Sequence, residues 1–133
     1  MRILITGVTG FVGPYLAEHI AAGAPEAEVW GLVWAADREE APASIRPIEG
    51  DLTDISSLRA AFVKIQPEIV FHLAAASSVA SSCDHPGRYL EVNAVGTVNL
   101  LETVRAADRE VRVVVSSSGE VYGAVPVDQQ PIT

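Results

Sequence analysis

The stretch that decides the fold is Thr6-Gly7-Val8-Thr9-Gly10-Phe11-Val12-Gly13, in which a glycine recurs at every third position. It follows an apolar run over residues 2–6 that predicts a β-strand, and residues 11–22 behind it have helical spacing of apolar side chains. A glycine-rich turn between strand and helix is where dinucleotide-binding folds hold a pyrophosphate. We expect Gly7 to turn the chain off the strand, Gly10 to admit the phosphates and Gly13 to let the helix pack closely. The alternative is a turn of the same shape that binds no ligand.

Apolar runs alternate with amphipathic stretches along the rest of the chain. Further strands are expected over residues 28–34, 46–49, 68–73 and 111–115. Further helices are expected over residues 55–66, with Thr53 or Asp54 as the cap, and over residues 86–108. The segments 35–45, 74–85 and 116–133 are expected to be loops.

This order of elements predicts an α/β fold. Strands that alternate with helices form a doubly wound parallel sheet, here of about five strands with helices on both faces. Pro47 indicates that residues 46–49 form an edge strand. The helix over 86–108 is apolar nearly all round, so we expect it to be largely buried, with Gly96 allowing close approach to a neighbouring backbone.

Composition narrows the classes of function. The chain has 133 residues, which suits one domain, and a formal net charge of −8, which argues against nucleic acid or an anionic membrane as partner. No apolar run approaches the ~18 residues of a membrane span. Cys83 is the only cysteine, which excludes a disulfide within the chain and a multi-cysteine metal site. We therefore expect a cytoplasmic protein without a metal.

Polar or small residues follow three of the expected strands. Asp51, after the third strand, accepts a hydrogen bond from an adenine amino group or else caps the next helix. His72 is expected to be a hydrogen-bonded histidine near the core, and the small residues 74–76 after it leave room for a cofactor across the strand ends. Residues 116–118 are serines that follow the fifth strand, where side chains face the ligand crevice of such sheets. The alternative for them is a serine-rich turn.

Five segments together resemble a known family. TGVTGFVG, GDLTD, HLAA, NAVGTVNLLE and SSSGEVYG occur in this order within residues 3–123. They resemble the N-terminal part of the extended short-chain dehydrogenases/reductases, in particular the NAD(P)-dependent nucleotide-sugar epimerases and dehydratases. Within that family the first 20 residues and the SSGEVYG turn are most similar to reductases of GDP-4-keto-6-deoxy-mannose, followed by GDP-mannose and dTDP-glucose 4,6-dehydratases.

The resemblance implies a set of cofactor contacts along the strand ends. It implies that the glycines hold the pyrophosphate and that Phe11 and Val12 donate backbone amides to it. It implies that Asp51 and Leu52 contact adenine. The residues implied to line the nicotinamide side are Ala74, Ala75 and Ser77.

The resemblance also implies roles near the substrate. Ser118 corresponds to the serine that hydrogen-bonds the sugar at the carbon that exchanges hydride. Glu120 matches the glutamate that removes a proton from the sugar in dehydratases, although Gly119 replaces the acidic or hydroxyl residue often found beside it. Asn93 is implied to steady the sheet or to take part in a proton path.

Two departures from the family pattern matter. About 20 residues after Gly13, where an acidic residue indicates NAD, the chain has Val33 and Trp34. Asp37 and Arg38 follow, so the choice between NAD and NADP stays open. In addition, the family's Tyr-x-x-x-Lys pair is absent, because the only lysine is Lys64.

We therefore expect residues 1–133 to be an incomplete NAD(P)-binding domain without the C-terminal sugar-binding part. The parent enzyme is expected to be a homodimer that exchanges hydride with carbon 4 of a nucleotide sugar, while this part alone is inactive. Residues 111–115, interior in such a parent, are expected here to form an apolar edge that favours self-association. The alternative is a stand-alone dinucleotide-binding module or redox sensor. A serine hydrolase using Ser118 and His72 is disfavoured, because no G-x-S-x-G elbow is present.

Overall fold

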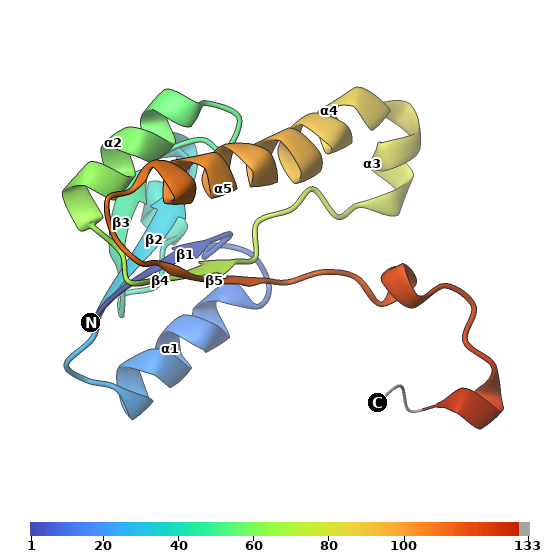
Figure 1. The fold of residues 1–133 in the computed structure, drawn as a ribbon, viewed down its shortest axis with the longest axis horizontal. Helices are drawn as coiled ribbons and strands as arrows, with labels where there is room; N and C mark the ends of the chain where they lie inside the picture. The colour runs from blue at the N-terminus through green and yellow to red at the C-terminus, as the bar shows by residue number, and fades with distance from the viewer. Residues whose placement is uncertain (131–133) are drawn as a thin grey trace.

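Five parallel strands form a single sheet in the computed structural model, which describes residues 1–130 (Figure 1). The strands run in the order β3-β2-β1-β4-β5, and all four neighbouring pairs are parallel. Their bounds are β1 Arg2–Thr6, β2 Glu28–Val33, β3 Arg46–Glu49, β4 Ile69–His72 and β5 Arg112–Val115. The predicted doubly wound sheet is confirmed, and Pro47 does lie in an edge strand.

Helices cover both faces of this sheet. In Figure 1, α1 (Gly13–Gly23) lies on one face, while α2 (Ile55–Ile65) and α5 (Gly96–Ala106) lie on the other. Successive side chains of a strand point to opposite faces, so Leu4 joins the core under α2 and α5, whereas Ile3 and Ile5 join the core under α1. Each face of the sheet therefore has its own apolar cluster, one shared by α2 and α5 and one under α1.

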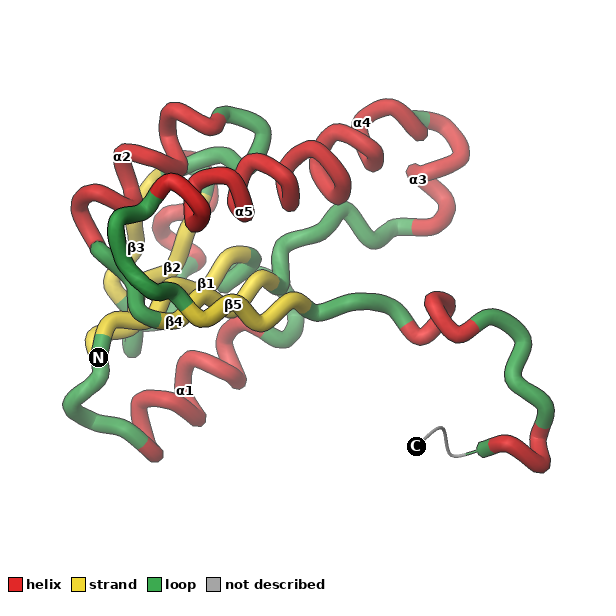
Figure 2. The backbone as a smooth tube through the Cα atoms, in the orientation of Figure 1, coloured by secondary structure: helices red, strands yellow, loops and turns green. Residues whose placement is uncertain are grey.

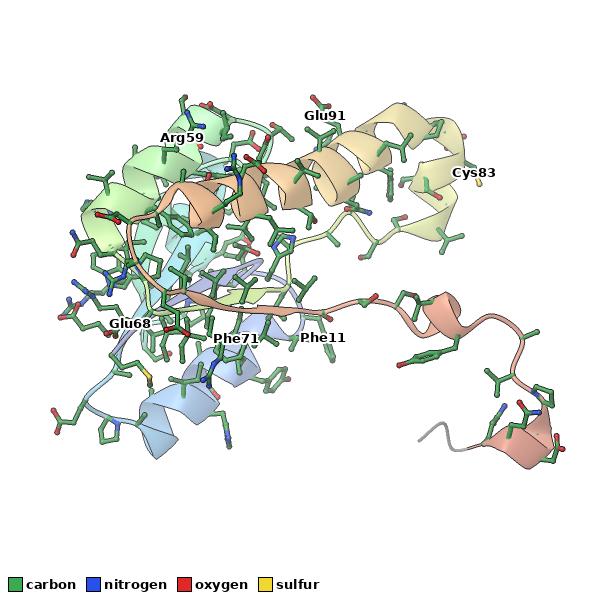
Figure 3. All side chains as sticks on the ribbon, in the orientation of Figure 1. Phe11, Arg59, Glu68, Phe71, Cys83 and Glu91 are labelled. Carbon is green, nitrogen blue, oxygen red and sulfur yellow. The ribbon has the colours of Figure 1, made fainter. Side chains whose placement is uncertain are left out.

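The segment expected to be one long helix contains a π-helical turn. It comprises α4 (Pro86–Leu90), the π turn η2 (Glu91–Val95) and α5, which Figure 2 shows as a continuous helical run. In the π turn the Gly96 N–H donates to the carbonyl of Glu91, five residues back. Glu91, labelled in Figure 3, points away from the sheet.

The expectation that this helical segment is largely buried is wrong for the described part of the chain. Leu90 and Val98 are 66% and 56% exposed, because α2 and the sheet cover only one side of the segment. The covered side holds Gly96 and Leu100. A Cβ atom on Gly96 would lie 3.0 Å from that of Leu52, so the expected close approach at this glycine is present.

Two segments expected to be loops contain short helices. Residues 74–85 include α3 (Val79–Asp84), capped by the Ser78 hydroxyl, and residues 35–45 include the 3-10 helix η1 (Ala35–Glu40). Neither segment has an apolar period long enough to reveal a helix in the sequence. Between β5 and residue 130 the chain forms the 3-10 turns η3 (Gly119–Tyr122) and η4 (Val127–Gln129), and this part runs away from the sheet. Over residues 1–130, no helix combines the length and apolarity that crossing a bilayer requires.

Candidate functional site

The carboxyl ends of β1 and β4 border a cleft of about 530 Å³. These strands are neighbours, and Thr6 at the end of β1 is in register with His72 at the end of β4. From β1 the chain continues to α1 on one face, whereas from β4 it continues towards α5 on the other. Ligands bind at such a switch point in open α/β sheets, since the two connections diverge and leave a crevice.

The glycine-rich turn forms one wall of this cleft. Gly7 has φ +72°, and a Cβ atom there would lie 2.7 Å from the backbone nitrogen of Ala74. The Gly10 N–H donates to the Gly7 carbonyl at 3.0 Å, which closes a tight turn whose exposed residue is Gly10. A Cβ atom on Gly13 would overlap the carbonyl oxygen of Val8, so α1 can begin this close to the turn only with glycine there.

Phe11 and Val12 lie in the turn at the start of α1 and are exposed, at 86% and 54%. The Phe11 ring packs edge-on against Tyr15, with 5.9 Å between centroids. Phe11, labelled in Figure 3, is not among the residues that line the cleft. Because Phe11 and Val12 belong to the turn, the helix begins two residues later than expected, at Gly13.

A chain of hydrogen bonds runs beneath the cleft and assigns the tautomer of His72. Thr97 donates its hydroxyl proton to the carbonyl of Asn93 at 2.7 Å, so its oxygen accepts from Nε2 of His72 at 2.9 Å. Nδ1 is then the acceptor and receives the hydroxyl proton of Thr6 at 2.7 Å. Thr6 in turn accepts from the backbone N–H of Ala74 at 3.3 Å. Each donor in this series of hydrogen bonds faces an acceptor only if His72 is neutral with its proton on Nε2.

Burial lowers the pKa of His72, in agreement with this neutral form. Its side chain is 4% exposed, so the predicted hydrogen-bonded histidine near the core is confirmed. His72 therefore supports the residues that follow β4 and does not itself line the cleft.

Asn93, from the π turn, holds the same segment from the other side. Its Oδ1 accepts from the Ala76 N–H at 2.7 Å, and its Nδ2 donates to the Ala76 carbonyl at 2.9 Å. This pair of bonds holds the backbone of Ala76 beside the cleft. Of the two roles implied for Asn93, the steadying role matches these contacts.

The loop after β3 is also held by internal hydrogen bonds. Asp51 accepts at one carboxylate oxygen from both the N–H and the hydroxyl of Thr53, each at 2.8 Å. The Ser57 hydroxyl accepts from the Asp51 N–H at 2.9 Å. The cap of α2 is Asp54, whose carboxylate accepts from the Ser56 N–H, so the capping alternative for Asp51 is wrong. Asp51 instead lines the cleft together with Leu52.

The structure brings together most of the predicted cofactor contacts. Six of them line the cleft: Gly7, Gly10, Asp51, Leu52, Ala74 and Ala75. Gly13 supports the turn from behind, as described above. Ser77 is exposed and follows the lining segment without belonging to it.

The two predicted catalytic residues lie apart from this group. Ser118 is exposed in the loop after β5 and does not line the cleft. Glu120 lies in η3, where the structure describes its backbone but not its side chain. Their roles stay predictions. Their segment follows the outer strand of the described sheet, where Figure 2 shows it extending away from the other elements.

Several lining residues carried no signal in the sequence. α3 contributes Ser81, α4 contributes Arg88 and Tyr89, and His85 lies between the two helices, in a region predicted as loop or as buried helix. Within residues 1–130, the basic side chains that line the cleft are those of His85 and Arg88. On the opposite side, Trp34 and Asp37 line it at the end of β2.

Comparisons with known proteins agree with this geometry. Residues 4–133 match the protein family described as GDP-mannose 4,6 dehydratase. The UDP-glucose 4-epimerase of Mycolicibacterium smegmatis is 35% identical over 95% of this chain and 42% of that protein. The GDP-6-deoxy-D-mannose reductase of Pseudomonas aeruginosa is 32% identical over 98% of this chain and 38% of that protein.

Among solved structures, the Thermus thermophilus UDP-glucose 4-epimerase in complex with NAD is similar, with a TM-score of 0.70 and 36% identity. The match covers 79% of this chain and 34% of that one. The chain thus spans about two fifths of the length of the curated relatives it matches.

Proposed function

Because the chain belongs to the GDP-mannose 4,6 dehydratase family, we propose that it binds NAD or NADP in the cleft between β1 and β4. We further propose that it is the cofactor-binding part of an enzyme that acts on nucleotide sugars. The observation that carries this proposal is the opening of the Gly7–Gly10 turn onto the cleft at the switch point of the sheet.

The residues present fit a dinucleotide. The exposed face of Gly10 bears no side chain, so a pyrophosphate can approach the backbone at the start of α1, where free N–H groups and the helix dipole favour an anion. Asp51 and Leu52 would hold the adenine end, and Ala74 and Ala75 the nicotinamide end. Ser77 would stand at the rim of that end. Small side chains at 74–76 leave room for a flat ring.

The chemistry belongs largely to the cofactor, which when bound would accept a hydride from carbon 4 of the sugar or donate one to it. This chain's own residues would orient the partners of that exchange. Ser118 would hydrogen-bond the sugar at the reacting carbon, and Glu120 would serve as a base if the reaction includes a dehydration. The specific hypothesis is a reductase of GDP-4-keto-6-deoxy-mannose, since Gly119 differs from the residue usual in dehydratases.

The proton donor and the sugar pocket are proposed to lie outside residues 1–133. The chain has no Tyr-x-x-x-Lys pair and spans about two fifths of its relatives' length. The proposal accordingly assigns sugar binding to residues other than these 133, as the length of the relatives suggests. The competing hypothesis is a dinucleotide-binding module that does not catalyse.

Fluorescence titration tests cofactor binding directly. Trp34 lines the cleft and is 46% exposed, so NAD⁺ or NADP⁺ should change its emission. Gly10→Ala places a methyl group where the phosphates would lie, with only the Gly7 carbonyl 3.2 Å away, so the fold should tolerate it. We expect this variant to bind at least about tenfold more weakly, a loss of ~1.4 kcal/mol. Gly23→Ala, which meets nothing within 4 Å, is the matched control.

Two outcomes would contradict the proposal. One is the absence of any saturable change with millimolar NAD⁺ or NADP⁺. The other is equal affinity in Gly10→Ala and Gly23→Ala. If dinucleotide binds but a longer chain that includes the proposed sugar-binding part turns over no nucleotide sugar, the non-catalytic module replaces the enzyme as the better hypothesis.

A further inference from the structure

The end of β2 decides whether such a cleft accepts a 2′-phosphate on the adenosine ribose. An acidic side chain there binds the 2′-hydroxyl of NAD and repels the extra phosphate of NADP, whereas a free arginine accommodates that phosphate. In this chain β2 ends at Val33, and the next residue is Trp34, so neither group occupies the usual position.

The acidic side chain that reaches the cleft comes from the 3-10 helix beyond β2. Asp37 lies in η1, three residues after Trp34, and both residues line the cleft. The Asp37 N–H donates to the Trp34 carbonyl at 3.0 Å, which folds the helix back towards the strand end. An acidic residue therefore lines the cleft just beyond β2, the strand whose end carries the acidic residue in other dinucleotide-binding sheets.

The neighbouring arginine is held elsewhere. The Arg38 guanidinium forms an ion pair with Glu49 at the end of β3, with 3.0 Å between Nη1 and Oε1. Arg38 is not among the cleft-lining residues. Both partners are about half exposed, so the ion pair is weak. It favours the paired arrangement of Arg38 over the unpaired one by no more than about fivefold.

The other basic groups on the cleft enter from a different direction. His85 and Arg88 belong to the segment that follows β4, whereas η1 follows β2 on the opposite side of β1. This arrangement separates the cations of the cleft from the end where the adenosine ribose is proposed to bind.

We propose that Asp37 makes this cleft select NAD over NADP, and that Glu49 supports the selection by holding Arg38 away from the ribose. The inference rests on the proposed binding of a dinucleotide. In this proposal Asp37 binds the ribose 2′-hydroxyl from η1, whereas in other dinucleotide-binding sheets the acidic residue stands at the end of β2 itself.

The test compares NAD⁺ and NADP⁺ affinities of the full chain by titration. We expect the unmodified protein to bind NAD⁺ at least about tenfold more tightly, because hydrogen bonds to a charged group contribute this much and like charges repel. Asp37→Asn should bring the two affinities within about threefold of each other. Glu40→Gln removes the same charge from the same helix at an exposed residue that does not line the cleft, and should keep the full preference.

A second pair of variants tests the role of Glu49. Glu49→Gln releases Arg38 and should improve NADP⁺ binding by up to about fivefold, with NAD⁺ binding unchanged. Adding Arg38→Ala to that variant should abolish the gain. If the gain persists without the arginine, charge removal alone explains it, and the holding role of Glu49 is wrong.

The outcomes separate this inference from the function on which it rests. If neither dinucleotide binds, the proposed function fails and the selection with it. If both bind with equal affinity, or NADP⁺ more tightly, cofactor binding stands and the selection is overturned. A preference for NADP⁺ that Arg88→Ala removes would assign the 2′-phosphate to α4 instead.

Discussion

The hydroxyl of Thr6 lies 2.7 Å from Nδ1 of His72, and this bond joins the ends of the two strands that border the cleft. Both side chains are buried, and the bond requires Nδ1 to be unprotonated so that it can accept the hydrogen bond from the Thr6 hydroxyl. A protonated imidazole would donate from both nitrogens and leave the Thr6 hydroxyl without its acceptor. Cleft geometry and the ionisation of one histidine are therefore linked.

The first prediction is that stability falls on mild acidification. Burial lowers the pKa of His72 below its ordinary value of 6.5. As the pH drops below about 6.5, the unfolded chain takes up a proton that the folded chain refuses, so the free energy of unfolding decreases until the folded pKa is passed. One proton gives a slope of at most about 1.4 kcal/mol per pH unit. Urea unfolding between pH 7.5 and about 5 measures it.

His72→Gln should flatten that slope while lowering stability at pH 7.5. His19→Gln, at an exposed position on α1, is the control and should retain the slope of the unmodified protein. An unchanged slope in His72→Gln would show that another group takes up the proton.

The second prediction concerns the contact between α1 and the glycine-rich turn. A Cβ atom at Gly13 would collide with backbone atoms of Val8 and Gly7, which cannot rotate away as a side chain can. Gly13→Ala should therefore lower the free energy of unfolding by about 1–3 kcal/mol. Gly23→Ala on the same helix should have almost no effect. Thermal unfolding of the two variants makes the comparison, and equal melting temperatures would refute the close packing.

The third prediction concerns the loop that carries Asp51. The Ser57 hydroxyl accepts from the Asp51 N–H and donates to carbonyls of the same turn, so Ser57→Ala leaves a half-buried N–H without an acceptor. We expect a loss of about 1 kcal/mol in stability and weaker dinucleotide binding through the displaced Asp51. Ser56→Ala removes an exposed bond that water can replace, and should cost less on both counts. Larger effects from Ser56→Ala would contradict this assignment.

The fourth prediction concerns the outer edge of the described sheet. β5 pairs with β4 along one edge, and within residues 1–130 its other edge has no partner strand, while its side chains Val114 and Val115 are 44% and 47% exposed. Open apolar edges pair with other chains, so the 133-residue chain should self-associate at tens of micromolar. Val114→Lys should reduce this association, and Val63→Lys, on the exposed side of α2, should not. Sedimentation velocity decides, and a monodisperse unmodified monomer would argue against edge pairing.

The order of strands and helices was predictable because glycines, prolines and apolar runs are local signals. The cleft position of Gly7, Asp51 and Ala74 followed from topology, since carboxyl ends of parallel strands share one edge of the sheet. Asp37 could not be placed in this way, because a short 3-10 helix carries no apolar period.

The surroundings of the second long helical segment were harder to predict. The apolar sequence over residues 86–108 indicates which side chains would be stabilised by burial, but whether they are buried depends on which other elements lie beside them. Leu90 and Val98 stay exposed because α2 covers only one side of the segment. Arg88 and Tyr89 line the cleft from α4, whose rotation relative to α5 depends on the π turn between them, and i→i+5 bonding has no clear mark in the sequence.

That π turn makes the length of the segment as important as its composition. A π turn holds one more residue than the α-helical turn it replaces. Deleting a single residue between Glu91 and Val95 would restore α-helical phase and rotate α4 by ~100° about the common axis relative to α5. Arg88 would then leave the cleft wall although every remaining residue of α4 was unchanged. The loss of one codon within this π turn would therefore change which side chains line the cleft.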